Sequence, residues 1–190
     1  MKKQRKIDKK RRRQAKTDYR KRLVLLKSKS PRVVVRKTNR YIILQIIESK
    51  HAKDKVLYSV NTKELLKLGW PEEKKGSLKS ISASYLGGLL LGKKAKELKE
   101  RVILDTGLIP NTKGSRVYAV VKGLADSGIE IKYNEKIMPS EDRIQGKHIN
   151  LDIKPIIDKI GIKVKKENIN NSTKLEVLQS DNLKDTEEDN

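Results

Sequence analysis

The 190-residue chain has no cysteine and no phenylalanine, and only two histidines and one tryptophan. Without cysteine it can form no disulfide, no thiolate zinc site and no cysteine nucleophile. His51 and His148 lie far apart and have no carboxylates at ligand spacing, so we expect neither a metal site nor a catalytic triad. No apolar run approaches the roughly 20 residues of a membrane-spanning helix, and no signal-peptide pattern follows the basic N-terminus. A soluble intracellular protein, without a cofactor, is therefore expected.

Acidic residues are scarce beside basic ones. The chain holds 46 Lys and Arg against 24 Asp and Glu, a formal net charge of +22. A compact chain with this charge repels itself unless a polyanion neutralises it, and a phosphate backbone is well suited to do so. The composition predicts a nucleic-acid partner. An anionic membrane is the weaker alternative, because the sequence offers no apolar anchor.

The excess charge is concentrated at the N-terminus. Residues 1–22 contain 13 basic and two acidic residues. Such an arm has too little apolar surface to order by itself, but it can neutralise several phosphates at once. Tyr19, among these cations, could stack on a base or dock on the fold. We interpret residues 1–22 as a basic RNA- or DNA-binding arm, the alternatives being a solubilising tail or a localisation signal.

A β-hairpin is predicted next. Residues 32–37 and 40–48 are rich in β-branched residues and flank the polar turn 37–40, and residues 55–60 form a third strand candidate. The apolar runs are continuous rather than alternating, which is typical of strands buried on both faces. We therefore expect a sheet with helices above and below it, and basic side chains clustered at the hairpin turn.

Helices and shorter strands complete the expected core. A short helix over residues 19–27 has Thr17 or Asp18 as its N-cap. A long helix over residues 78–98 is capped by Ser77, and its three glycines are interpreted as sites of close helix-on-sheet packing. The remaining elements are a strand at 101–104, a helix at 116–126 capped by Ser115, and an extended piece at 129–132.

The composition divides the chain into four parts: the arm at 1–22, an α/β core at 23–133, an irregular surface extension at 134–163 and a polar tail at 164–190. Residues 174–190 carry two Lys and six acidic residues. This tail is expected to be disordered and acidic, and it could shield the arm before a polyanion binds.

Several segments together resemble the archaeal-type large-subunit ribosomal protein 18 family. They are TDYRKRLVLLKSKSPRVVVRKTNRYIILQII, SLKSISASYLGGLLLGKKAKE, VILDTGL, GSRVYAVVKGLADSGIEI and PSEDRIQGKHI, in order between residues 9 and 149. The resemblance implies a three-layer, ribonuclease-H-like α/β core with a mixed sheet. It also implies a non-enzymatic constituent of the cytoplasmic large ribosomal subunit. By the same resemblance the protein binds 5S rRNA and helps attach it to the 23S-type rRNA, among neighbouring proteins of the central protuberance.

The RNA contacts that the resemblance implies fall on the arm and the hairpin. On the arm they are Arg11, Arg12, Arg13, Lys16, Thr17, Tyr19, Arg20 and Arg22. On the hairpin they are Arg32, Arg36, Lys37, Thr38, Asn39, Arg40 and Tyr41.

Two other functions are alternatives. A nuclease needs several carboxylates around paired cations, but the hairpin strands over residues 32–47 contain no Asp or Glu. Asp105 and Asp126 are interpreted as a strand-end loop residue and a solvated helix residue. The second alternative is a general nucleic-acid-binding architectural protein. Selective binding of 5S rRNA over duplex DNA would distinguish the ribosomal function from this alternative.

Overall fold

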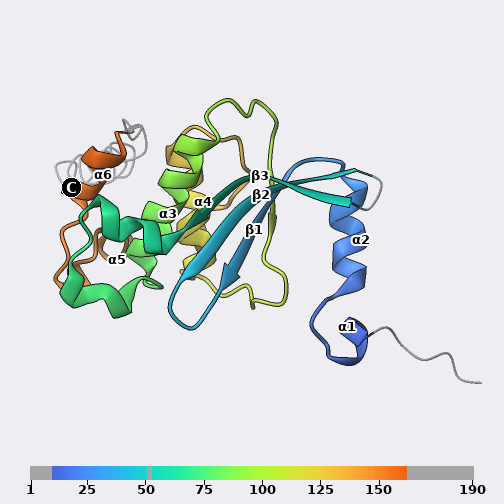
Figure 1. The fold of residues 1–190 in the computed structure, drawn as a ribbon, viewed down its shortest axis with the longest axis horizontal. Coiled ribbons are helices and arrows are strands. Elements are labelled where there is room, and N and C mark those ends of the chain that lie inside the picture. Colours follow the sequence, from blue (N-terminus) through green and yellow to red (C-terminus); the bar gives the residue numbers. More distant parts are fainter. Residues whose placement is uncertain (1–9, 51–52, 162–190) are drawn as a thin grey trace, which may run out of the picture.

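The computed structural model describes residues 10–50 and 53–161, and it confirms an α/β fold built on one mixed sheet (Figure 1). The sheet order is β3-β2-β1-β4. The first two neighbouring pairs are antiparallel, and β1 pairs with β4 in parallel. A parallel bridge between Val102 and Ile131 continues the sheet beyond β4. The strands are β1 (Arg32–Lys37), β2 (Ile42–Lys50), β3 (Lys53–Asn61) and β4 (Ile103–Asp105).

The predicted hairpin is confirmed in its register. β1 and β2 pair from Arg32↔Ile47 to Lys37↔Ile42, so the chain reverses between Lys37 and Ile42. The β-branched residues of both strands favour this pleated arrangement. A bulge between Ile46 and Ile47 shifts the pairing of β2 with β3.

The helices lie close to the predicted places, with one clear difference. The long helix begins at Ile81 rather than at residue 78, because the Ser80 side chain accepts the capping bond from the Ala83 amide. Ser77 instead ends a 3₁₀ segment and donates its hydroxyl to the Lys74 carbonyl. The α-helices are α1 (Lys10–Arg13), α2 (Tyr19–Lys27), α3 (Ile81–Lys94), α4 (Arg116–Asp126), α5 (Glu141–Gln145) and α6 (Lys154–Ile160). The 3₁₀ helices are η1 (Thr62–Leu68), η2 (Glu72–Ser77), η3 (Glu135–Ile137) and η4 (Lys147–Ile149).

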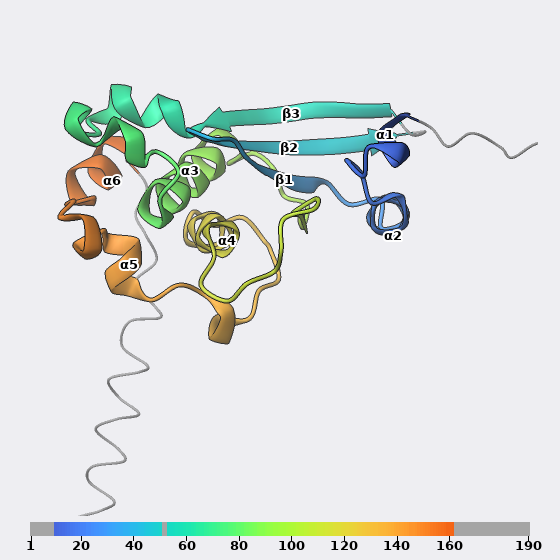
Figure 2. The same cartoon turned by 90° about the horizontal axis from the view of Figure 1, so that it is seen from below.

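Both long helices, α3 and α4, cover the same face of the sheet (Figure 2). The prediction of helices above and below is therefore wrong for the part of the chain that the structure describes. Val33 and Val35 point into the core against these helices, whereas Val34 does not belong to that cluster. On the opposite face, Arg32 is buried and forms an ion pair with Asp105. Val34 is buried as well, so the first four residues of β1 are buried on both faces although both long helices lie on one.

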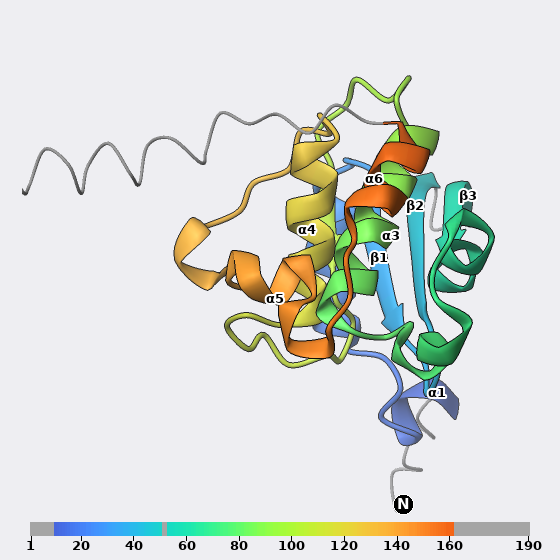
Figure 3. The same cartoon turned by 90° about the vertical axis from the view of Figure 1, so that its left-hand side faces the viewer.

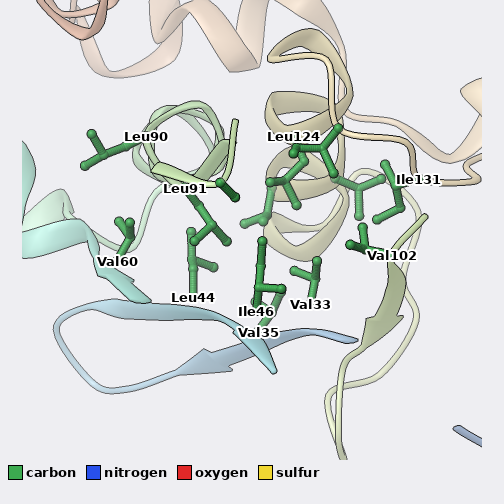
Figure 4. Close-up of a cluster of buried hydrophobic side chains, with 14 of the residues drawn as sticks. Val33, Val35, Leu44, Ile46, Val60, Leu90, Leu91, Val102, Leu124 and Ile131 are labelled. Atoms are coloured by element: carbon green, nitrogen blue, oxygen red, sulfur yellow. The ribbon is translucent and has the colours of Figure 1, made fainter. Parts of the chain in front are cut away.

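The main core fills the space between the sheet and the two helices. Figure 4 shows aliphatic side chains from β1, β2 and β3 meeting those of α3 and α4. Because Phe is absent, the packing is carried mainly by Ile, Leu and Val.

The α3 and α4 helices touch through two glycines. A Cβ atom on Gly88 would lie 2.5 Å from the Val120 carbonyl oxygen, and one on Gly123 would collide with the Tyr85 carbonyl oxygen. Gly87 instead faces Leu44 of β2, as the interpretation of helix-on-sheet packing requires. The interpretation therefore holds for Gly87, whereas Gly88 serves helix-on-helix packing.

A second apolar cluster lies at the other side of α3. There α5 and α6 pack beside it (Figure 3), and their Ile144, Ile156 and Ile160 are buried. Trp70 is buried in the same cluster and donates its indole N–H to the Lys74 carbonyl, so it cannot stack on a base. The segment after residue 134 is thus more regular than the sequence suggested. Among residues 10–50 and 53–161, no helix is long and apolar enough to cross a membrane.

Candidate nucleic-acid interface

The basic arm enters the structure through α1 and α2. Asp18 is the N-cap of α2, since its carboxylate accepts a hydrogen bond from the Lys21 amide at 3.0 Å. This resolves the choice between Thr17 and Asp18. The side chains of Arg13, Lys16 and Arg20 are exposed, Tyr19 is 40% exposed and Thr17 is partly buried. The side chains of Arg11 and Arg12, and residues 1–9 as a whole, lie outside what the structure describes.

Two cations fix α2 to the sheet. The Lys21 ammonium donates to Thr106 Oγ1 at 2.9 Å and to the Gly107 carbonyl at 3.2 Å. The Arg22 guanidinium pairs with Asp54 at 2.7 Å. Figures 1 and 2 show α2 beyond the end of the sheet at which β1 begins. The arm therefore leaves the domain from a fixed point.

Arg32 is a buried residue of the same network. Its guanidinium donates to Asp105 at 2.9 Å, to Asp54 at 3.1 Å and to Ser49 Oγ at 2.9 Å. Its side chain is only 2% exposed. Arg32 was predicted to contact RNA, but in this structure it is not accessible and instead joins β1 to β4 and β3. Asp105, predicted to be a strand-end loop residue, is the last residue of β4 and is buried as the partner of Arg32.

Asp54 joins the arm to this buried network. Partial burial opposes its ionisation, but hydrogen bonds from Ser49 and Arg22 and the charges of Arg22 and Arg32 outweigh that effect, so the pKa of Asp54 is below its ordinary value. Asp54 is consequently a stable anion that holds two arginines.

Arg36 lies between the network and solvent. Its guanidinium donates to the carbonyls of Val35 and Asp105 at 2.9 and 3.1 Å, and its side chain is 45% exposed. It can therefore keep these bonds and still present part of its charge outward.

The hairpin turn is held by Thr38. Its hydroxyl donates to the Tyr41 carbonyl at 2.8 Å and accepts from the Tyr41 amide at 2.9 Å. Lys37, Asn39 and Arg40 are exposed around this closed turn, and Tyr41 is partly buried. Thr38 thus shapes the turn, while its neighbours offer donors to solvent.

The predicted contact residues do not form one continuous cluster. The arm and the Arg32 network lie at one end of the hairpin, and the turn lies at the other (Figure 1). The six residues of β1 separate them by roughly 20 Å, at about 3.3 Å a residue. The surface therefore offers two cationic regions at opposite ends of a rigid strand pair.

Sequence reasoning missed Lys21, Asp54 and Asp105 as the anchors of α2 and β1. One signal for Asp105 was available, since a carboxylate directly after the apolar run Val102, Ile103 and Leu104 needs a partner when the strand is buried. Among the described residues, no group of three or more His, Asp and Glu side chains is arranged to hold a metal ion.

Asp126, which was interpreted from the sequence as a solvated helix residue, is partly buried in the structure. It accepts a hydrogen bond from the Tyr85 hydroxyl at 2.8 Å. Burial raises the pKa of Asp126, and the hydrogen bond from Tyr85 only partly opposes this effect. Burial and the neighbouring carboxylate raise the pKa of Tyr85, which therefore remains a donor. The pair joins α3 to α4 and lies apart from the arm network.

Comparison with known proteins identifies the family. Residues 3–100 and 93–134 match the family described as ribosomal large subunit proteins 60S L5 and 50S L18. The large ribosomal subunit protein uL18 of Korarchaeum cryptofilum is 50% identical over 145 residues, which cover 76% of this chain and 72% of that protein. The uL18 protein of Methanoregula boonei is 43% identical over 164 residues, covering 83% and 92%. The chain therefore belongs to the uL18 family and is a structural, RNA-binding constituent of the cytoplasmic large ribosomal subunit.

Proposed function

We propose that the chain binds 5S rRNA and helps attach it to the large-subunit rRNA in the central protuberance, beside neighbouring ribosomal proteins. Membership of the uL18 family supports a place in the large subunit. The observation that carries the proposal furthest is the fixed position of α2, held by Lys21 and Arg22. Phosphate contacts supply attraction, but only contacts of fixed geometry select one folded RNA.

The predicted contact residues take two roles in this proposal. Exposed cations and polar side chains meet RNA, whereas buried or bonded ones position them. The described members of the contact group are Arg13, Lys16, Tyr19, Arg20, Arg36, Lys37, Asn39 and Arg40. Arg11 and Arg12 join the proposal on the sequence alone, because their side chains lie outside what the structure describes. The positioning group is Thr17, Arg22, Arg32, Thr38 and Tyr41, which are at least partly buried or are bonded within the domain.

The core acts as a scaffold of ribonuclease-H-like topology. Three antiparallel strands are followed by α3, by β4 parallel to β1, by α4 and by the parallel bridge at Ile131. This order of elements supports a ribonuclease-H-like topology in which both long helices lie on one face of the sheet. Asp105, which a nuclease would direct at a cation, is engaged by Arg32 and Arg36. Residues 164–190, the predicted acidic tail, lie outside the described residues.

Competition binding tests the proposed function. Labelled 5S rRNA is titrated with the full chain near 0.15 M salt, and excess duplex DNA or an unrelated RNA is added. We expect the 5S complex to survive both competitors, because its contacts require one folded RNA. Equal loss to both would support a general nucleic-acid-binding architectural protein instead.

A matched pair of variants tests the role of the turn. Arg40→Ala removes an exposed cation from the closed turn, and Lys75→Ala removes one from η2. Arg40→Ala should reduce the preference for 5S rRNA, because the hydrogen bonds of Thr38 fix the turn on which Arg40 lies. Lys75→Ala should leave the preference unchanged. A loss of preference in both variants would indicate a response to net charge alone.

A further inference from the structure

A cavity of about 490 Å³ opens beside the turn end of the hairpin. It is lined by Lys37 and Ile42 of the hairpin, by the N-terminal ends of α3 and α4, and by the loop between β4 and α4. This places it at the end of β1 opposite to Arg32 and the arm. Its volume is in the range of sites that hold a small organic ligand, and it far exceeds the space that one water molecule takes.

The polar lining of the cavity is basic. Lys37, Lys113, Arg116, Arg143 and His148 contribute to it, and no acidic residue does. Within residues 10–50 and 53–161, none of these five side chains forms an ion pair with a carboxylate. At the other end of the hairpin, by contrast, Arg22 and Arg32 have carboxylate partners. The uncompensated charge around a concave surface attracts an anion.

The N-terminus of α4 adds unused hydrogen-bond donors. Ser80 caps α3 through its hydroxyl, but Ser115, the N-cap of α4, makes no capping bond. The Ser115 hydroxyl oxygen is buried and has no hydrogen-bond partner in the described structure, although Ser115 lines the cavity. No acidic residue occupies the first turn of α4, so its amide groups and helix dipole are not compensated by the chain itself. A buried hydroxyl without a partner is costly unless a ligand supplies one.

From these observations we infer that the cavity is a phosphate site, filled in the ribosome by a backbone phosphate and its nucleotide from bound RNA. Lys113 and Arg116 neutralise the phosphate, and Ser115 and the first amides of α4 donate to its oxygens. An isolated phosphate ion would fill only part of the cavity volume, whereas a whole nucleotide within an RNA strand is closer to that volume in size. The inference rests on the proposed function and adds a second contact, at the opposite end of the hairpin from the arm.

A charge-matched comparison tests the site. Lys113→Gln combined with Arg116→Gln removes two cations from the cavity, and Lys63→Gln combined with Lys67→Gln removes two exposed cations from η1. Binding of 5S rRNA by the full chain is measured over a range of salt concentrations. The cavity variant should bind more weakly and show a salt slope smaller by about 0.7 to 0.9 for each phosphate that it no longer neutralises. The η1 variant should keep a slope close to that of the unmodified protein.

Ser115 gives a test without a change of charge. Ser115→Ala should weaken 5S rRNA binding several-fold without changing the salt slope, and Ser115→Thr, which keeps the hydroxyl, should restore binding. A photo-crosslinking residue at Thr112, which lines the cavity, should capture RNA, and the same residue at Lys75 should not.

The outcomes separate this inference from the proposed function. If the unmodified chain binds 5S rRNA selectively but the cavity variants match it in affinity and slope, the phosphate site is overturned and the proposed function stands. The assignment of the cavity to RNA is likewise overturned if inorganic phosphate raises the thermal stability of the unmodified chain but not of Ser115→Ala, while RNA neither competes with the phosphate nor crosslinks at Thr112. If the unmodified chain does not select 5S rRNA, both fail.

Discussion

Arg32 shows how a single residue predicted to bind RNA can be required for a different reason. Its charge is buried and is balanced by Asp105 and Asp54. Removing one partner of a buried ion pair leaves the other charge without compensation, and this loss is larger than the net contribution of the intact pair. Arg32 and Asp105 should therefore act on binding through the stability and position of β1.

We predict that Asp105→Asn lowers the free energy of unfolding by about 3 kcal/mol, because it leaves the buried Arg32 guanidinium without its nearest anion. Asp142→Asn is the control. The Asp142 carboxylate pairs with Lys147 but is 70% exposed, so its loss should cost less than about 0.5 kcal/mol. Denaturant unfolding measures both. Equal, small losses would show that the Arg32 network contributes little to stability.

Asp126 should respond to pH in the opposite direction to a salt-bridged carboxylate. Burial raises its pKa in the folded state, so the folded protein favours the protonated acid. Below the unfolded pKa of about 3.9 the group is protonated in both states and costs nothing. As the pH rises through the folded pKa, the folded state loses stability relative to the unfolded one.

The free energy of unfolding of Asp126→Asn, relative to that of the unmodified chain, should therefore increase as the pH is raised from about 4 to about 7. The asparagine carbonyl keeps the acceptor for Tyr85 but cannot ionise. Unfolding free energies of both proteins across this range give the difference directly. A difference that is constant, or that falls with rising pH, would contradict the assignment of Asp126 as a carboxylate that resists ionisation.

At the scale of elements, the contact between α3 and α4 depends on glycine. Alanine is the better helix former by about 1 kcal/mol, so glycine at Gly88 and Gly123 needs a compensating reason. The distance from a Gly88 Cβ to the Val120 carbonyl oxygen, 2.5 Å, provides it, because backbone cannot give way as a flexible side chain can. The two helices approach as closely as they do because both positions lack a side chain.

Gly88→Ala and Gly123→Ala should each destabilise the fold by about 1 to 3 kcal/mol in spite of the gain in helix propensity. Gly76→Ala provides the comparison, since a Cβ there would meet nothing within 4 Å. Thermal or denaturant unfolding of the three variants distinguishes packing from propensity. Stabilisation by either interhelical alanine would mean that the helices can separate at little cost.

The sequence predicted most elements because their signals are local. The β-branched residues of β1 and β2, the Asp18 cap and the apolar stripe of α4 all act within a few residues. Which face of the sheet receives α3 and α4 depends on contacts between distant segments. The ion pair of Arg32 with Asp105 joins residues 73 positions apart, and no local pattern could assign it.

The sequence predicted which basic residues belong to the candidate site, but not how their side chains are arranged in space. Basic residues of the arm and the turn were identified from charge alone, but charge does not report that Arg32 is buried and Arg40 exposed. The cavity was missed because its cations come from separate segments, including those of Lys37, Arg116 and His148. Only the fold brings them together.

At the scale of the molecule, charge and geometry are divided between two kinds of structure. The arm carries 13 of the 46 basic residues within residues 1–22, and the sheet holds α2 and the turn at a set separation. The arm should therefore set the strength of binding and its response to salt, whereas the sheet should set which RNA is chosen.

The salt dependence of 5S rRNA binding tests this division most directly. The logarithm of the association constant is plotted against the logarithm of salt concentration for the unmodified chain and for a variant with Arg11, Arg12 and Arg13 replaced by Ala. The account predicts weaker binding and a slope reduced by about 2 to 3, at about 0.7 to 0.9 for each phosphate that the variant no longer neutralises. An unchanged slope would show that the arm does not touch RNA in the complex, and the account would then be wrong.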